Sequence, residues 1–99
     1  MAIDLFCYSK KSAKEAQELL DKFINQHPEW FETHIYLPNA AHDLDKIGKE
    51  VALEEHQIDV NSLFLISYND KNKAFGETSL QLQNALKEIF SGDIYMYCI

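Results

Sequence analysis

The apolar positions of this 99-residue chain alternate between short strand-like runs and longer stretches of helical periodicity. Four runs predict strands at residues 3–8, 33–37, 63–68 and 94–99. Each gap between them holds one pattern with a 3.6-residue period, and a strand spacing of about thirty residues is typical of repeated βαβ units. The pattern therefore predicts one βαβαβαβ domain over residues 1–99, with four strands and three helices.

The first helix has clear signals at both ends. Ser12, followed three residues later by Glu15, forms the pattern of a capping box. His27 and Pro28 mark the other end, because the residue before a proline avoids the α region. We therefore expect a helix over residues 12–26.

The second strand and the second helix are less sharply bounded. The strand ends at Pro38, which suits the edge of a sheet better than its middle. The helix should run from residue 41 or 44 to residue 56, with most of its acidic side chains on the outer sides. One side of it, predicted to face inward, holds Leu44, Ile47, Gly48, Val51 and either Glu55 or Ile58.

The last helix is expected to begin at Thr78, whose pairing with Gln81 makes a second capping box, and to end at Gly92. The strand before it, residues 63–68, is apolar on both faces. This pattern is typical of a central strand that helices cover on both sides.

The simplest arrangement with right-handed crossovers is a four-stranded, mostly parallel sheet in the order 2-1-3-4, a shortened flavodoxin-like fold with three layers. The first helix would lie alone on one face, and the other two would share the opposite face. The last strand would then be thinly covered and would present either Tyr95 and Tyr97 or Ile94 and Met96. Such a patch predicts a partner, with a homodimer through residues 94–99 as one option.

The composition is that of one compact domain. With 46% hydrophobic residues, the chain can build one core but not two. No segment approaches the roughly 20 apolar residues that span a bilayer, and the N-terminus lacks a basic stretch followed by a long apolar run. These features predict a cytoplasmic protein without membrane contact. Cys7 and Cys98 lie in apolar strands, which suits reduced thiols in that compartment.

Charge is distributed unevenly along the chain. Residues 29–59 hold eight of the sixteen acidic side chains against Lys46 and Lys49, so this segment carries six of the seven net negative charges. Nucleic-acid binding depends on clustered Lys and Arg, and this acidic chain has no arginine. A basic protein is therefore the expected partner. The predicted partner-binding surface comprises Asp43, Asp45, Glu50, Glu54, Glu55 and Asp59.

A second candidate site follows from the predicted parallel sheet. Ligands of such sheets bind beyond the carboxyl ends of the strands, where the loops at residues 9–12, 39–43 and 69–77 would lie side by side. Cys7 ends the first strand just before a helix N-terminus, whose dipole would activate a thiol. The alternative ligand loops comprise Cys7, Ser9, Lys11, Ser12, Asn39, Asn69, Asp70 and Glu77. Loops are also polar when they are merely solvated. The histidines share no metal-ligand spacing, so we expect no metal or cofactor.

Two resemblances bear on this second site. Residues 3–12 resemble the phosphocysteine loop of cellobiose-type phosphotransferase IIB proteins, although this loop has no glycine. That resemblance implies a phosphoryl carrier with Cys7 as the nucleophile. Residues 4–9 and 63–68 are similar to bacterial Toll/interleukin-1 receptor domains, which would make Glu77 a catalytic glutamate, although the Trp-rich surroundings of that family are missing. Whether the chain is an enzyme stays open here, with binding favoured over catalysis.

The favoured interpretation is a small acidic protein-binding module. The chain resembles the barstar type of inhibitor, because it is small and acidic and ends in a helix, a Gly-Asp pair and a final strand over residues 86–99. This resemblance implies a bacterial immunity or antitoxin-type inhibitor that docks its acidic flank on a basic toxin or nuclease. The alternative is a small α/β enzyme or phosphoryl carrier that uses Cys7 or the loops at the strand ends.

Overall fold

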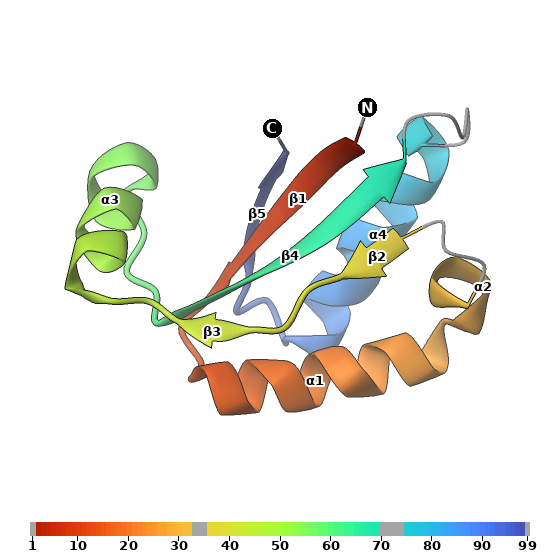
Figure 1. The fold of residues 1–99 in the computed structure, drawn as a ribbon, viewed down its shortest axis with the longest axis horizontal. Coiled ribbons are helices and arrows are strands. Elements are labelled where there is room, and N and C mark those ends of the chain that lie inside the picture. Colours follow the sequence, from red (N-terminus) through yellow and green to blue (C-terminus); the bar gives the residue numbers. More distant parts are fainter. Residues whose placement is uncertain (1, 33–35, 70–74, 99) are drawn as a thin grey trace.

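The structure is a computed structural model that describes residues 2–32, 36–69 and 75–98, of which residues 2, 3, 69, 75–79 and 98 are described by their backbone alone. Figure 1 shows the arrangement of its helices and strands. In this part of the chain the elements are, in order, β1 (Ala2–Ser9), α1 (Ala13–Gln26), α2 (Pro28–Phe31), β2 (Tyr36–Pro38), β3 (His42–Asp43), α3 (Lys46–His56), β4 (Ser62–Asn69), α4 (Phe75–Ile89) and β5 (Tyr95–Cys98).

The strands form one sheet in the order β2-β4-β1-β5, and β3 pairs with β4 on the same side as β2. Every neighbouring pair of described strands is antiparallel. In the register of the central strands, Tyr8 lies opposite both Leu63 and Tyr95, and Ser9 lies opposite Ser62. The predicted four-stranded, mostly parallel, flavodoxin-like sheet in the order 2-1-3-4 is therefore wrong.

The error lies in how the βαβ units combine. β1 and β2 run in the same direction because both are antiparallel to β4. β4 and β5 also run in one direction because both are antiparallel to β1. Each unit, β1-α1-β2 and β4-α4-β5, thus has a strand of the other unit between its own two strands, which is the split βαβ arrangement of ferredoxin-like folds. Apolar spacing is the same for both kinds of sheet, because it reports which residues are buried and not which strands are neighbours.

The second predicted crossover, from the strand at residues 33–37 to the strand at residues 63–68, does not exist. β2 and β4 are antiparallel neighbours, so the segment that joins them, with β3 and α3, returns the chain along the strand it has just left. A helix in such a connection need not lie over the sheet. This topology leaves α3 apart from α1, α2 and α4 (Figure 1).

One face of the sheet is covered by α1, α2 and α4, and the main core lies between these helices and the sheet. Side chains alternate along each strand, so Leu5 of β1 and its partner Ile66 of β4 point to this same face. The covered side of the molecule therefore has two layers. The buried members of the core are Leu5, Cys7, Ala16, Leu20, Phe23, Phe31, Tyr36, Phe64, Ile66, Tyr68, Leu82, Leu86 and Phe90.

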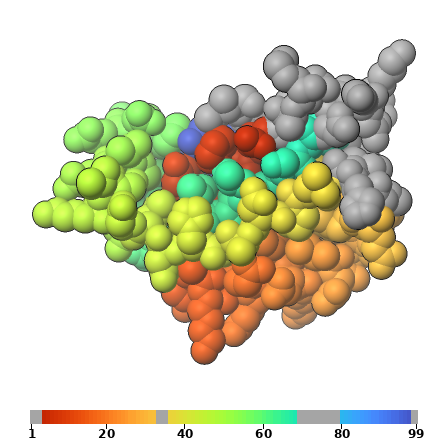
Figure 2. Space-filling view, viewed as in Figure 1, coloured from red at the N-terminus to blue at the C-terminus, as the bar shows by residue number. Residues whose placement is uncertain are grey.

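Within the described part of the chain, the opposite face of the sheet is covered at one end, by α3 and the segment that follows it. There Tyr8, Ala52 and Val60 form a second, smaller buried cluster. In the space-filling view, the yellow-green atoms of α3 form the left end of the molecule (Figure 2). α2 lies at the other end of the sheet (Figure 1).

The helix ends follow local sequence signals. The Ser12 cap is confirmed, because its Oγ accepts a hydrogen bond from the backbone N–H of Glu15 at 3.3 Å. The last helix begins at Phe75 and not at Thr78. Gly92 follows this helix with a φ of +80°, which glycine adopts without strain, and the sequence predicts a glycine in this role.

Candidate functional site

α3 is fixed mainly by its two ends. The Asp45 side chain caps the first turn, where its Oδ1 accepts a hydrogen bond from the Gly48 N–H at 2.6 Å. At the other end Gln57 adopts the left-handed conformation with a φ of 58°, and its N–H donates to the Leu53 carbonyl at 3.0 Å. Ala52 is the buried residue of this helix. The helix is therefore well defined while most of its surface faces solvent.

A cluster of aromatic rings lies between the last turn of α3 and the sheet. The His56 ring lies 4.4 Å from the Tyr97 ring and 5.4 Å from the Tyr95 ring, between ring centroids. Tyr97 in turn stacks on Phe6 at 5.0 Å and on Tyr8 at 5.9 Å. The last turn of α3 thus rests on β1 and β5. The acidic helix and the last strand are therefore in contact.

Tyr97 is a titratable group of this cluster whose protonation equilibrium is perturbed. Burial raises the pKa of Tyr97 to about 12 from its ordinary value of 10.0, and its hydrogen bond with Tyr8 adds to the shift. The Tyr8 and Glu55 charges contribute further. The Tyr97 hydroxyl therefore stays neutral at any physiological pH.

The outer face of α3 combines apolar and acidic side chains. Ile47 and Val51 are 71% and 40% exposed, and Glu50 and Glu54 are exposed beside them. These four positions have the spacing i, i+3, i+4 and i+7, which places them on one side of a helix. The prediction that Ile47 and Val51 face inward is wrong, because the narrow contact of α3 with the sheet uses Ala52. The two glutamates within the apolar stripe are the signal that could have indicated this.

The six acids predicted to bind a partner separate into different roles. Asp43 accepts a hydrogen bond at Oδ1 from the Ala13 N–H at 2.8 Å, at the start of α1, and Asp45 caps α3. Glu50, Glu54, Glu55 and Asp59 are exposed. Of these, Glu55 lies with Oε2 4.0 Å from the Nε2 of His56.

Two further acids of the acidic segment lie elsewhere. Glu29 belongs to α2 and Glu32 follows it, at the opposite end of the sheet from α3 (Figure 1). A backbone hydrogen bond, together with a hydrogen bond from the His27 ring at 3.1 Å, holds the pKa of Glu29 below its ordinary value. The acidic segment therefore does not form one continuous flank.

Cys7 lies in the main core and not in a loop. It is 0% exposed, and its Sγ contacts the Leu5 carbonyl at 3.8 Å. The strand continues for two more residues to Ser9, so the thiol does not face the N-terminus of α1. This position does not favour a phosphocysteine or a catalytic nucleophile. Cys98 is on the neighbouring strand, where its backbone pairs with Leu5.

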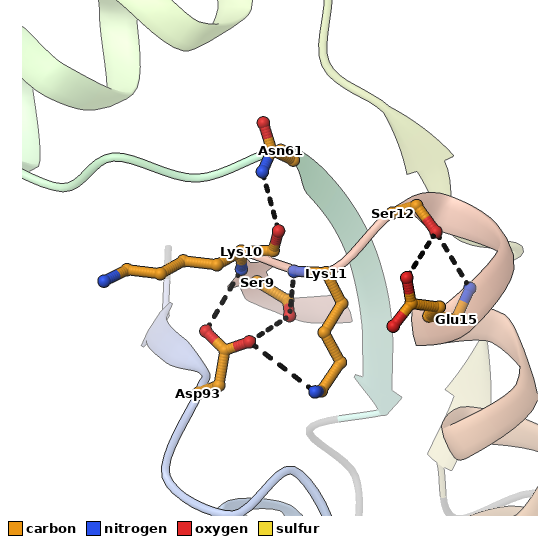
Figure 3. A network of polar contacts seen from close by, with 7 residues as sticks. All are labelled: Ser9, Lys10, Lys11, Ser12, Glu15, Asn61 and Asp93. Carbon is orange, nitrogen blue, oxygen red and sulfur yellow. Dashed lines mark hydrogen bonds and ion pairs between the residues drawn. The ribbon is translucent and has the colours of Figure 1, made fainter.

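Ser9 and Lys11 belong to a network around Asp93, which was not among the predicted site residues (Figure 3). The Asp93 carboxylate accepts hydrogen bonds from the Lys10 N–H at 3.2 Å and from the Ser9 Oγ at 3.5 Å, and it lies 3.9 Å from the Lys11 Nζ. On the other side of this turn, the Asn61 side chain donates a hydrogen bond to the Lys10 carbonyl at 2.6 Å. These contacts hold the turn before β5 against the end of β1, which is a structural role.

The structure does not bring the three predicted ligand loops together. β1 and β4 are antiparallel, so the segment after β1 and the segment after β4 lie at opposite ends of the sheet. Ser12 caps α1, and Asn39 donates its N–H to the Leu65 carbonyl at 2.8 Å. Asn69 and Glu77 are described by their backbone alone, and Asp70 lies outside the described residues.

A groove of about 560 Å³ opens beside α3, between the segment after this helix and the turn before β5. Tyr8, Asp59, Asp93 and Tyr95 are among its lining residues. Asp59 thus adds an acidic group at the edge of the α3 surface. Among the described residues, no group of three or more His, Cys, Asp or Glu side chains could hold a metal ion. None of the described helices is long and apolar enough to cross a bilayer.

Comparisons with known proteins agree on one family. The family model described as CDI System Immunity Component matches residues 1–95. Immunity protein CdiI-2 of Burkholderia pseudomallei (strain 1026b) is 43% identical over 74 residues, which cover 75% of this chain and 71% of that protein. A chain in the CdiA-CT/CdiI toxin and immunity complex from Burkholderia pseudomallei matches with a TM-score of 0.82 and 32% identity, over 97% of this chain and 90% of that chain.

Proposed function

We propose that this chain, which belongs to the family of CDI system immunity components and is an immunity protein that binds a toxin, holds its toxin with the acidic outer side of α3. One observation carries this proposal. Glu50, Glu54 and Glu55 are exposed on a single helix that stands apart from the other helices. Among the described residues, neither Glu50 nor Glu54 pairs with a lysine.

The toxin surface that meets α3 is then basic. Glu50, Glu54, Glu55 and Asp59 supply the complementary charges, whereas Asp43 and Asp45 act mainly as helix caps that hold β3 and α3 in place. Complementary charge steers two proteins together and raises the association rate, which suits an inhibitor that must reach its toxin quickly. The solved relative in a toxin and immunity complex supports a protein partner. Cytoplasmic action and a homodimer through residues 94–99 stay predictions.

The test reverses the charges of Glu50, Glu54 and Glu55 together to Lys. We expect the association rate with the cognate toxin to fall by about 10- to 1,000-fold at low salt. The difference should shrink as the salt concentration rises, because salt screens exposed charges. Stopped-flow fluorescence at several salt concentrations measures the rate, and urea unfolding checks that the fold is unchanged.

A matched control reverses Glu18, Glu32 and Glu88 to Lys, which makes the same change in net charge away from α3. All three side chains are exposed. The proposal predicts a much smaller loss of association rate for this control. Equal losses in the two variants would show that overall charge matters and the α3 surface does not.

A further inference from the structure

We infer that Ile47 and Val51 are apolar anchors, which enter an apolar depression of the toxin whose rim is basic. This inference rests on the proposed function, because it assigns the centre of the same docking surface. Ile47 is the most exposed of the large hydrophobic side chains identified as exposed in the described part of the chain. Three of the six such side chains lie on α3, namely Ile47, Val51 and Leu53.

The fold itself does not require these two side chains. Neither belongs to the main core or to the smaller cluster around Tyr8 and Val60. Isoleucine and valine are also β-branched, which makes them poorer helix formers than the alanine at position 52. Their presence on the exposed side of a short helix therefore calls for a contact outside this chain.

The arrangement matches the anatomy of a protein–protein interface. Such interfaces have a centre from which charged residues are depleted and a rim that is polar and hydrated. Here Ile47 and Val51 sit one turn apart, with Glu50 and Glu54 on the same side of the helix. The chemistry of the partner follows: an apolar depression receives the two branched side chains, and Lys or Arg residues around it meet the two carboxylates.

The helix presents these side chains in a fixed position. Its first turn is held by the Asp45 cap and its last turn by the contacts of His56 with Tyr95 and Tyr97. Binding to a preformed surface loses less conformational entropy than binding that must order a flexible segment. The groove that Asp59 lines borders the same end of the molecule, so a toxin seated on α3 can extend into it.

The experiment replaces Ile47 and Val51 with Ala in the full chain and measures both rate constants for the cognate toxin. We expect the dissociation rate to rise by about 10- to 100-fold, because apolar contacts at the centre of an interface mainly set the lifetime of the complex. The association rate and its salt dependence should change by less than about twofold. Circular dichroism and urea unfolding should match the parent protein, since both side chains are exposed.

The matched control replaces Leu37 and Leu80, which are 51% and 62% exposed on β2 and α4, with Ala. It should leave the dissociation rate unchanged within about twofold. If the charge-reversal variant loses association while the Ile47 and Val51 variant keeps its dissociation rate, the anchors are refuted and the charged surface stands. If the chain alone forms a dimer in sedimentation that only the double variant abolishes, the two side chains serve self-association, and the inference is overturned.

Discussion

α1 and α3 both carry apolar residues at helical spacing but use them in opposite ways. α1 turns Ala16, Leu20 and Phe23 into the main core. α3 buries Ala52 alone and exposes Ile47 on its outer face. Apolar residues at helical spacing therefore indicate that one side of a helix will be covered, but not that the same chain covers it.

The two helices differ in what stands between their apolar residues. In α1 the stripe of inner positions holds no charged residue. In α3 the stripe that contains Ile47 and Val51 also contains Glu50 and Glu54. A charged group within an apolar stripe cannot be buried without losing its hydration, so a mixed stripe of this kind indicates a surface for a hydrated contact with another protein.

The comparison can be tested most strongly with one substitution made on both helices. Leu20→Ala on α1 removes a side chain that is 1% exposed and should lower the free energy of unfolding by about 2–5 kcal/mol. Leu53→Ala on α3 removes a side chain that is 57% exposed and should change it by less than about 0.5 kcal/mol. Urea unfolding gives both values. Comparable losses would mean that α3 packs on the fold as α1 does.

The helix caps offer a second, smaller test. Ser12→Ala and Asp45→Ala each remove a side chain that accepts a hydrogen bond from a backbone N–H. Each loss should lower the stability of the helix by about 1 kcal/mol. The loss at Ser12 should appear in global unfolding, because α1 belongs to the main core. The loss at Asp45 should appear as faster amide exchange within α3, with little change in global unfolding, because this helix can open locally.

Asp45→Asn provides the control for the cap of α3. Asparagine caps a helix about as well as aspartate but carries no charge. Amide exchange in α3 should therefore stay as in the parent protein. Fast exchange in this variant would show that the charge of Asp45, and not its cap, holds the helix.

Local sequence signals were sufficient for much of the secondary structure. The Ser12 cap and the end of α1 before Pro28 depend on neighbouring residues, and the structure has both where the sequence predicts them. The position of α3 depends on how distant strands pair. Spacing along the chain does not record whether β2 and β4 are neighbours, so the topology and the covered face could not be read from it.

The candidate site was predicted only in part, because some roles of its residues depend on neighbours in the sequence and others on contacts between distant segments. Glu50, Glu54 and Glu55 are exposed, as expected of a charged helix face. Asp43 and Asp45 have the same charge, but Asp43 accepts a hydrogen bond from the first residue of α1 and Asp45 caps α3. Aspartate is a favoured N-cap residue, so Asp45 could have been assigned from the sequence, whereas the contact of Asp43 with α1 needs the tertiary structure.

Tyr97 lies on β5, where its ring contacts His56 of α3, and its titration gives the smallest predicted effect at neutral pH. Its pKa of about 12 in the folded protein exceeds the ordinary value of 10.0, so the folded state holds this proton more tightly than the unfolded chain does. The resulting stability is complete below pH 10 and is lost as the pH rises from 10 to 12. Tyr97→Phe should therefore lose less stability than the parent protein over that interval. The lysines and the other tyrosines are present in both proteins, so the difference between their urea unfolding energies reports on Tyr97, and parallel pH profiles would refute its raised pKa.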